Sequence, residues 1–186
     1  MRKSVFVICA ILFSLSLSAQ EKTQSISAEL FGAQNSFGVN YDARFKGNSG
    51  LGYRVGIGYG YGETSTFFGE ETVKGVGVPI ELNYLLGKKN NKFEVGVGTS
   101  LGAYHYKEEH TYYYAPTPDF PDGMIARYKV SGKRFGYFVF GTIGYRYQKP
   151  NGFVFRAGLS PSVNFGDKCG LNKSLLYPYV GMGWSF

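Results

Sequence analysis

The stretch YPYVGMGWSF, residues 177–186, decides the fold, because its apolar side chains alternate with small or polar ones to the last residue of the sequence. Pro178, Val180, Met182, Trp184 and Phe186 fall on one face of an extended strand, and the residues between them fall on the other. A strand with one wholly apolar face has to bury that face in protein or in lipid. The pattern therefore predicts a final β-strand with a large apolar surface to cover.

Seven further segments alternate in the same way at near-regular spacing, and we predict a strand in each. They are residues 25–33, 37–45, 51–61, 76–86, 93–102, 135–147 and 153–159. The chain lacks the i, i+3, i+4, i+7 spacing of apolar residues that is typical of an amphipathic helix. The sequence thus predicts an all-β fold of eight antiparallel strands.

The less apolar faces of these strands carry charged residues among many glycines, all at one parity. The charged residues are Glu29, Asp42, Arg44, Arg54, Glu81, Glu94, Arg146 and Arg156. Facing lipid, each arginine near the midplane would cost roughly 2–4 kcal/mol and the whole set on the order of 10–30 kcal/mol, against a typical domain stability of about 5–15 kcal/mol. Inside a narrow barrel the four acids and four arginines can pair, and glycines make room for large neighbours. A soluble barrel shares the period with inverted faces, but this face favours an up-and-down transmembrane β-barrel with a charged interior.

Aromatic residues and connections support this orientation. One set of strand ends carries the aromatic residues expected of an interfacial girdle, namely Phe45, Tyr53, Tyr84, Phe93, Tyr145, Phe153, Trp184 and Phe186. Three short turns rich in Lys, Asn and Gly alternate with three longer loops: the turns are residues 46–50, 87–92 and 148–152, and the loops are residues 62–75, 104–133 and 161–174. A periplasmic amino terminus would place every short turn inside and every long loop outside. The outer connection at residues 34–36 is unusually tight.

The start of the chain predicts export. Residues 1–19 have a basic start, an apolar run and small residues at Ser18 and Ala19, as in a secretory signal peptide, and the run is too short to span a membrane as a helix. Residues 20–186 would then form one barrel domain, with Cys169 as its single cysteine and no intrachain disulfide. Without Arg2 and Lys3 the charge is about +5 and scattered. Nucleic acid is therefore not an expected partner.

The final strand resembles the closing strand of bacterial outer-membrane barrels, whose assembly signal is matched by Tyr179, Gly181, Trp184 and Phe186. With the other segments, residues 20–186 resemble the small eight-stranded outer-membrane β-barrel proteins of the OmpA/OmpX type, in the porin-like superfamily. The resemblance implies location in the bacterial outer membrane, contact with its lipids and lipopolysaccharide, and assembly by the barrel-assembly machinery. It leaves function open, because the family includes membrane-stabilising proteins, adhesins, evasion factors and a few lipid-modifying enzymes.

The third long loop, residues 104–133, is the best functional candidate. Residues 111–115 and 124–130 can extend the fifth and sixth strands as a hairpin with residues 116–123 at its tip. Candidate contacts are Tyr112, Tyr113, Tyr114 and Phe120. They could bind an extracellular protein by strand pairing or a glycan by aromatic stacking. A solvated loop without a dedicated ligand is the alternative.

Two other functions remain as alternatives. Side chains can fill an eight-stranded barrel, so the charges predict a plug, or at most a narrow porin-like channel for ions or very small solutes. A lipid A-modifying enzyme would have to use His105, His110 and Ser100, which lack the His-x-Ser spacing of the lipid A deacylases that the chain resembles. The histidines and loop acids also lack metal-ligand spacing. We expect a monomeric, non-enzymatic structural or binding protein without catalytic residues, cofactor or metal.

Overall fold

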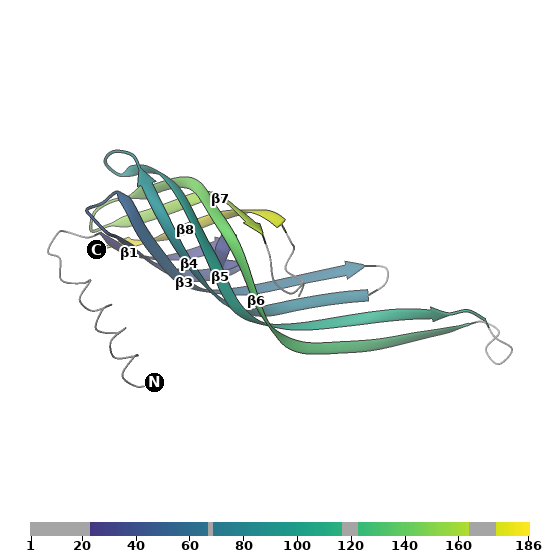
Figure 1. Ribbon diagram of the computed structural model, residues 1–186. Coiled ribbons are helices and arrows are strands. Elements are labelled where there is room, and N and C mark those ends of the chain that lie inside the picture. Colours follow the sequence, from purple (N-terminus) through teal and green to yellow (C-terminus); the bar gives the residue numbers. More distant parts are fainter. Residues whose placement is uncertain (1–22, 67–68, 117–122, 164–173) are drawn as a thin grey trace, which may run out of the picture.

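The computed structural model describes residues 23–66, 69–116, 123–163 and 174–186. Its eight strands close into an antiparallel up-and-down barrel, in which each strand pairs with the next and β1 pairs with β8 (Figure 1). The strands are β1 Gln24–Phe31, β2 Phe37–Arg44, β3 Gly50–Thr66, β4 Gly69–Leu86, β5 Asn91–Tyr114, β6 Met124–Gln148, β7 Phe153–Val163 and β8 Ser174–Ser185. The predicted all-β barrel is confirmed. In the part of the chain that the structure describes, no helix is long and apolar enough to cross a bilayer.

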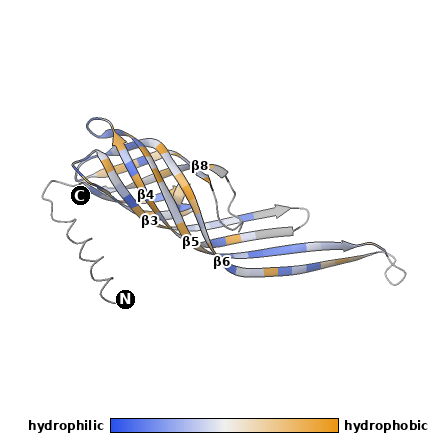
Figure 2. Ribbon diagram, in the orientation of Figure 1, coloured by the Kyte–Doolittle hydropathy of each residue, from blue (hydrophilic) through white to orange (hydrophobic). Residues whose placement is uncertain are grey.

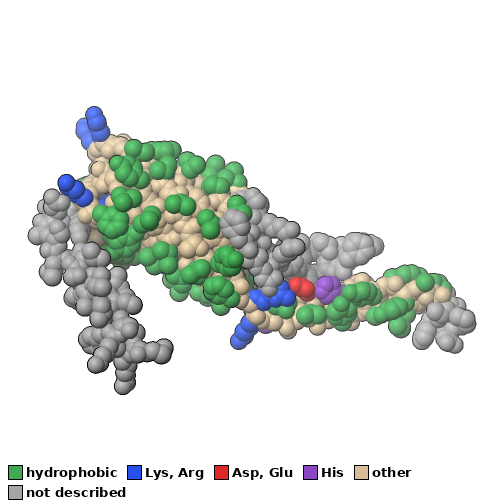
Figure 3. Space-filling model, viewed as in Figure 1, with side chains coloured by type: hydrophobic (Ala, Val, Ile, Leu, Met, Phe, Trp, Pro, Cys, Tyr) green, Lys and Arg blue, Asp and Glu red, His purple; other side chains and the backbone are tan. Residues whose placement is uncertain are grey.

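The two faces of the barrel wall have inverted polarity compared with a water-soluble barrel. Ile57, Val97 and Met182 point outward with 58%, 60% and 57% of their surface exposed, whereas the charged residues of the opposite parity are buried. Hydrophobic and hydrophilic residues are interspersed along the strands (Figure 2), and hydrophobic side chains are spread over the visible barrel wall, where charged side chains are confined to its end (Figure 3). An apolar surface of this extent is typical of contact with lipid.

The two ends of the barrel differ in their connections. The turn end carries the start of β1, the end of β8 and three short turns, where Gly47, Lys89 and Asn151 adopt positive φ. At the same end, the backbone of Phe186 exchanges two hydrogen bonds with that of Gln24, which closes the barrel seam. The opposite end, called the loop end here, carries the strand extensions. The three short turns therefore lie together at one end of the barrel, as predicted, whereas most of the predicted loop at residues 161–174 lies outside the described residues.

Two pairs of strands continue beyond the barrel at the loop end, one of them unexpectedly and the other as predicted. The prediction of a loop at residues 62–75 was wrong: β3 and β4 continue as paired strands to Thr66 and Gly69. Their extension is stabilised by β5, which pairs with β4 as far as Glu108. The predicted hairpin between the fifth and sixth strands is confirmed, because Tyr114 pairs with Met124. Both hairpins project beyond the barrel (Figure 1).

The tight connection between β1 and β2 folds into the barrel and closes it near the loop end. Its 3₁₀ turn, η1 Gly32–Gln34, is buried. Gln34 is fully buried and donates a hydrogen bond from Nε2 to Asn40 Oδ1. Gly58 leaves room for the turn, since a Cβ there would lie 2.7 Å from the Gln34 carbonyl oxygen. The first strand, predicted to reach residue 33, therefore ends at Phe31.

A small hydrophobic cluster inside the barrel lies beside this turn. Ala33 packs with Phe138 and Phe140, which point inward from β6 and are 7% and 1% exposed. The two rings lie 6.1 Å apart between centroids. The sequence prediction missed these phenylalanines, because Phe138, Val139 and Phe140 form an unbroken apolar run in which alternation is hidden.

Phe31 has a backbone conformation that is almost exclusive to glycine, with φ 62° and ψ −154°. We expect Phe31→Gly to be more stable than Phe31→Ala by about 1–3 kcal/mol, because both remove the ring but only glycine relieves the strain. This order reverses the ordinary preference for Ala over Gly in strands. Urea unfolding in lipid vesicles measures it. Equal stabilities, or a more stable Phe31→Ala, would show that the backbone here is unstrained.

Candidate functional site

The half of the interior nearest the turn end holds ion pairs centred on Asp42. Asp42 Oδ1 accepts a hydrogen bond from Arg44 Nη2 at 2.8 Å, and Asp42 Oδ2 accepts one from Arg146 Nη1 at 2.9 Å. Asn83 Nδ2 donates to Asp42 at 2.9 Å and to Glu94 at 2.8 Å. None of these five residues exceeds 3% exposure. Asn83 therefore joins the Asp42 pairs to a second group of charges.

The second group links five strands, β1, β3, β4, β5 and β7, through two arginines. Arg54 bridges Glu29, at 3.1 Å, and Glu81. Arg156 bridges Glu29, at 2.5 Å, and Glu94, at 2.8 Å. These five residues are at most 3% exposed. The structure thus brings all eight charged residues of the sequence prediction into one buried network, in which every carboxylate contacts at least one arginine.

This network fills the half of the barrel interior nearest the turn end. Each of the eight charged residues of the network is paired and hydrogen-bonded within it, which is the condition for placing a charge away from water. Within the described residues, no group of three or more His, Cys, Asp or Glu is arranged to hold a metal ion. We therefore interpret the network as a structural plug. Asn83 also belongs to this network, although the sequence analysis gave it no role.

The extended hairpin of β5 and β6 carries an aromatic cluster at its far end. The Tyr112 and Tyr128 rings stack at 5.3 Å and 12°, and their hydroxyls are 2.9 Å apart. This hydrogen bond raises the pKa of Tyr128 above its ordinary value. His110 packs 5.2 Å from Tyr128 and lies 3.2 Å, Nε2 to Oε2, from Glu108. The cross-strand contacts hold the hairpin in one shape.

Exposed apolar side chains surround this cluster on both faces of the hairpin. We call them the tip patch: Tyr112, Tyr113, Tyr114, Met124, Ile125 and Tyr128. Tyr113 and Ile125 face each other across the strands and are 66% and 61% exposed. Figure 3 shows hydrophobic side chains along this end of the hairpin, beyond charged groups that separate it from the barrel wall. The tip patch is thus distinct from the apolar wall of the barrel.

One long edge of the hairpin has no neighbouring strand in the described part of the chain. Among the described residues, β7 pairs with β6 only as far as Val139, and residues 124–133 pair with no described strand other than β5. Unpaired backbone groups along such an edge are a template for strand addition.

The other predicted residues are placed as follows. Tyr112, Tyr113 and Tyr114 belong to the tip patch, whereas Phe120 and Cys169 lie outside the described residues, as does the predicted signal peptide. Ser100 is buried and His105 is half-buried on β5, five positions further along the strand. An odd separation places them on opposite faces, so the structure does not bring them together.

The predicted assembly signal is divided between the two faces of β8. Tyr179 is buried in the interior, where the Arg156 guanidinium lies 5.2 Å from its ring centroid. Trp184 and Phe186 point outward and are 58% and 52% exposed. Both aromatics lie at the turn end, as a membrane-interface girdle requires. Recognition of these β8 residues by the barrel-assembly machinery stays a prediction.

Comparison with known proteins finds similarity among solved structures only. No protein-family model and no curated protein matches the chain. The N-terminal β-barrel domain of Pseudomonas aeruginosa OprF is 13% identical, with a TM-score of 0.49 over 90% of this chain and 98% of that one. Ail of Yersinia pestis is 14% identical, with a TM-score of 0.40 over 89% and 96%, and Acinetobacter baumannii CarO is 11% identical, with a TM-score of 0.44 over 88% and 97%. By its closed ring of eight strands, charged interior and apolar wall, the chain has the fold of the small eight-stranded outer-membrane β-barrels that its sequence resembles.

Proposed function

We propose that this protein is a non-enzymatic barrel of the bacterial outer membrane whose projecting β5–β6 hairpin binds an extracellular protein. The tip patch carries the proposal. Lipid accounts for the apolar wall of the barrel, but the hairpin extends beyond that wall, where its aromatic side chains would face water. An apolar cluster in that position is typical of a protein-binding surface.

The open edge of β6 supports the same partner class. A peptide strand added along residues 124–133 would pair with backbone groups, while the tip patch would supply apolar contacts to its side chains. Tyrosine is well suited to this task because it offers a large contact area at a low cost in side-chain entropy. A protein partner uses both features, whereas a glycan would use the aromatic rings alone.

The remaining features fit a monomer anchored in lipid. The wall would contact outer-membrane lipids and, on the cell surface, lipopolysaccharide. The interior network and the aromatic turn end would fix the barrel in the bilayer, and the loop end would face the exterior.

The binding proposal is tested with protein reconstituted in nanodiscs and applied to an array of extracellular-matrix and serum proteins. We expect saturable binding to at least one of them, weakened at least tenfold by Tyr113→Ser with Ile125→Ser. A trimmed variant that joins Lys107 to Ser131, which pair in the barrel-proximal hairpin, through an Asn-Gly turn should not bind. Equal binding by wild type and trimmed variant would contradict the proposal, as would no binding at all.

The interior network also predicts how the purified barrel behaves in a planar bilayer. Paired charges, η1 and the inward phenylalanines occupy the lumen, so we expect no stepwise ion conductance. Reproducible single-channel steps from the wild-type protein would instead support a narrow channel.

A further inference from the structure

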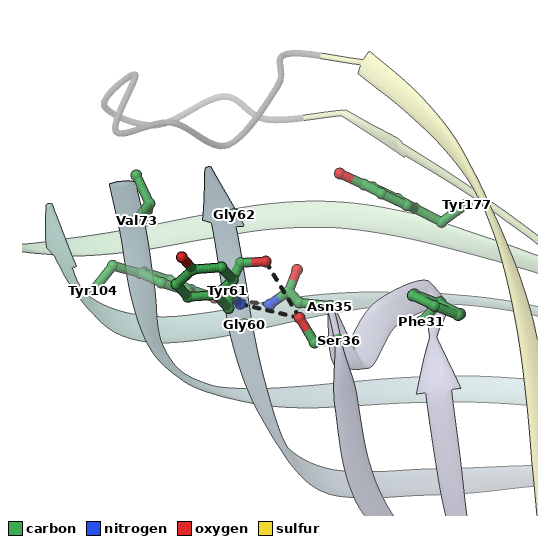
Figure 4. A pocket seen from close by; sticks show the side chains of 9 residues that line it. All are labelled: Phe31, Asn35, Ser36, Gly60, Tyr61, Gly62, Val73, Tyr104 and Tyr177. Atoms are coloured by element: carbon green, nitrogen blue, oxygen red, sulfur yellow. Dashed lines mark hydrogen bonds between the residues drawn. The ribbon is translucent and has the colours of Figure 1, made fainter. Parts of the chain in front are cut away.

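A cup of about 240 Å³ lies at the loop end of the barrel, above η1 (Figure 4). Its wall is built by residues at the ends of several strands, and its floor by the residues after η1. The lining residues are Phe31, Asn35, Ser36, Gly60, Tyr61, Gly62, Val73, Tyr104 and Tyr177. The cup is separate from the tip patch, which lies at the far end of the hairpin.

The lining of the cup combines aromatic rings with uncharged polar groups. Phe31 is half-exposed and Tyr177 is intermediate, so both rings have free surface at the mouth. Below them, Asn35 Nδ2 donates a hydrogen bond to the Tyr104 hydroxyl at 3.3 Å, and Ser36 Oγ accepts one from the Tyr61 backbone N–H at 3.0 Å. None of the side chains that line the cup carries a charge at neutral pH. A ligand that matches this lining is neutral, with an apolar face and hydroxyl groups.

Two lining residues hold strained backbone conformations. Phe31 has φ 62° and ψ −154°, and Asn35 has φ 64° and ψ −95°. They flank η1, whose last residue, Gln34, is fully buried in the barrel. Strain of this kind persists only where the surrounding structure imposes it, and it concentrates at ligand sites. Here the strain presents the Phe31 ring and the Asn35 amide to the same cavity before any ligand arrives.

We propose that the cup binds one neutral sugar residue of an extracellular glycan. The apolar face of a pyranose ring would stack on Phe31 or Tyr177, and its hydroxyls would reach Asn35, Ser36 and the Tyr104 hydroxyl. The cavity is smaller than the pockets of drug-sized ligands, so it accepts a single residue and leaves the rest of the glycan outside. This site is independent of the proposed protein-binding hairpin.

The test measures sugar binding by saturation-transfer NMR with protein in nanodiscs, because many detergents carry sugar headgroups. The probes are the methyl glycosides of glucose, galactose, mannose and N-acetylglucosamine, with glucuronate and p-cresol as charged and apolar comparisons. We expect transfer to at least one neutral glycoside, and weaker transfer to glucuronate and p-cresol.

Two variants locate the binding. A Cβ at Gly62 would meet no heavy atom within 4 Å, so Gly62→Leu should fold normally and fill the cup. We expect it to weaken sugar binding at least tenfold. Phe31→Gly removes the mouth ring and relieves backbone strain, and should weaken binding several-fold without loss of folding.

The hairpin variant Tyr113→Ser with Ile125→Ser serves as the matched control and should bind sugar as wild type does. Loss of protein binding with retained sugar binding would separate the two sites. Sugar binding unchanged by Gly62→Leu, preferred binding of glucuronate or p-cresol, or no transfer to any neutral glycoside would each overturn the cup proposal.

Discussion

Replacement of Arg54 by methionine is expected to lower the free energy of unfolding by about 3–5 kcal/mol, the usual cost of removing one partner from a buried ion pair. Arg54 is 3% exposed and contacts Glu29 and Glu81. Glu29 would keep its second partner, Arg156, at 2.5 Å. Glu81 would lose the only arginine that contacts it among the ion pairs of the described residues. The variant therefore leaves one carboxylate without compensation in the lumen.

A second substitution tests this reason directly. Adding Glu81→Gln to Arg54→Met removes the uncompensated charge, so the double variant should regain much of the lost stability. Arg127→Met, at an exposed position on the hairpin, is the matched control and should change stability by less than about 0.5 kcal/mol. Urea unfolding in vesicles measures all three. A loss below about 1 kcal/mol for Arg54→Met, or no recovery in the double variant, would contradict the network.

Val97→Arg is expected to destabilise the barrel by about 2–4 kcal/mol, because it places a charge on the lipid-facing wall. Val97 is 60% exposed and lies six positions along β5 from Asn91 at the turn end. At a rise of about 3.4 Å per residue and a strand tilt near 40°, it sits roughly 15 Å above that end, near the middle of an apolar band about 25 Å tall. The bilayer midplane is the depth at which an arginine on the lipid-facing wall is most destabilising.

Ile125→Arg provides the matched comparison for this prediction. Ile125 is 61% exposed, almost the same as Val97, but lies on the projecting hairpin. In water the substitution should change stability by less than about 0.5 kcal/mol. The same urea titration in vesicles compares the two variants. Equal effects at both positions would mean that their surroundings are alike and that the barrel wall does not face hydrocarbon.

Local alternation was sufficient to predict that the barrel has eight strands and which side of the wall the eight predicted charges face. Arg54 and Glu81, for example, share a parity with the neighbouring glycines, and they meet because β3 and β4 pair at those positions. The cross-barrel pairing of Glu29 with Arg156 could not be predicted from spacing, since it depends on how the ring closes. Pairing partners inside a barrel are a property of register and shear.

The features that the sequence did not reveal depend on distant contacts. Residues 62–75 have a loop-like composition of Gly, Glu, Thr and Ser, but β5 lies beside them and continues the sheet. The inward fold of η1 requires space that Gly38, Gly56 and Gly58 leave on two other strands. The cup above η1 exists only once several strand ends come together. Such sites carry no sequence motif.

The central claim is that hydrocarbon covers the outer wall while the ion-pair network fills the interior. The most direct test is a measurement of nuclear Overhauser effects in lipid nanodiscs with methyl-labelled isoleucine. We predict contacts from lipid acyl chains to Ile57, Ile80 and Ile143, which are 58%, 44% and 52% exposed on the barrel wall, and contacts from water to Ile125 on the hairpin. Water contacts at the three wall isoleucines, with no acyl-chain contacts, would contradict the account.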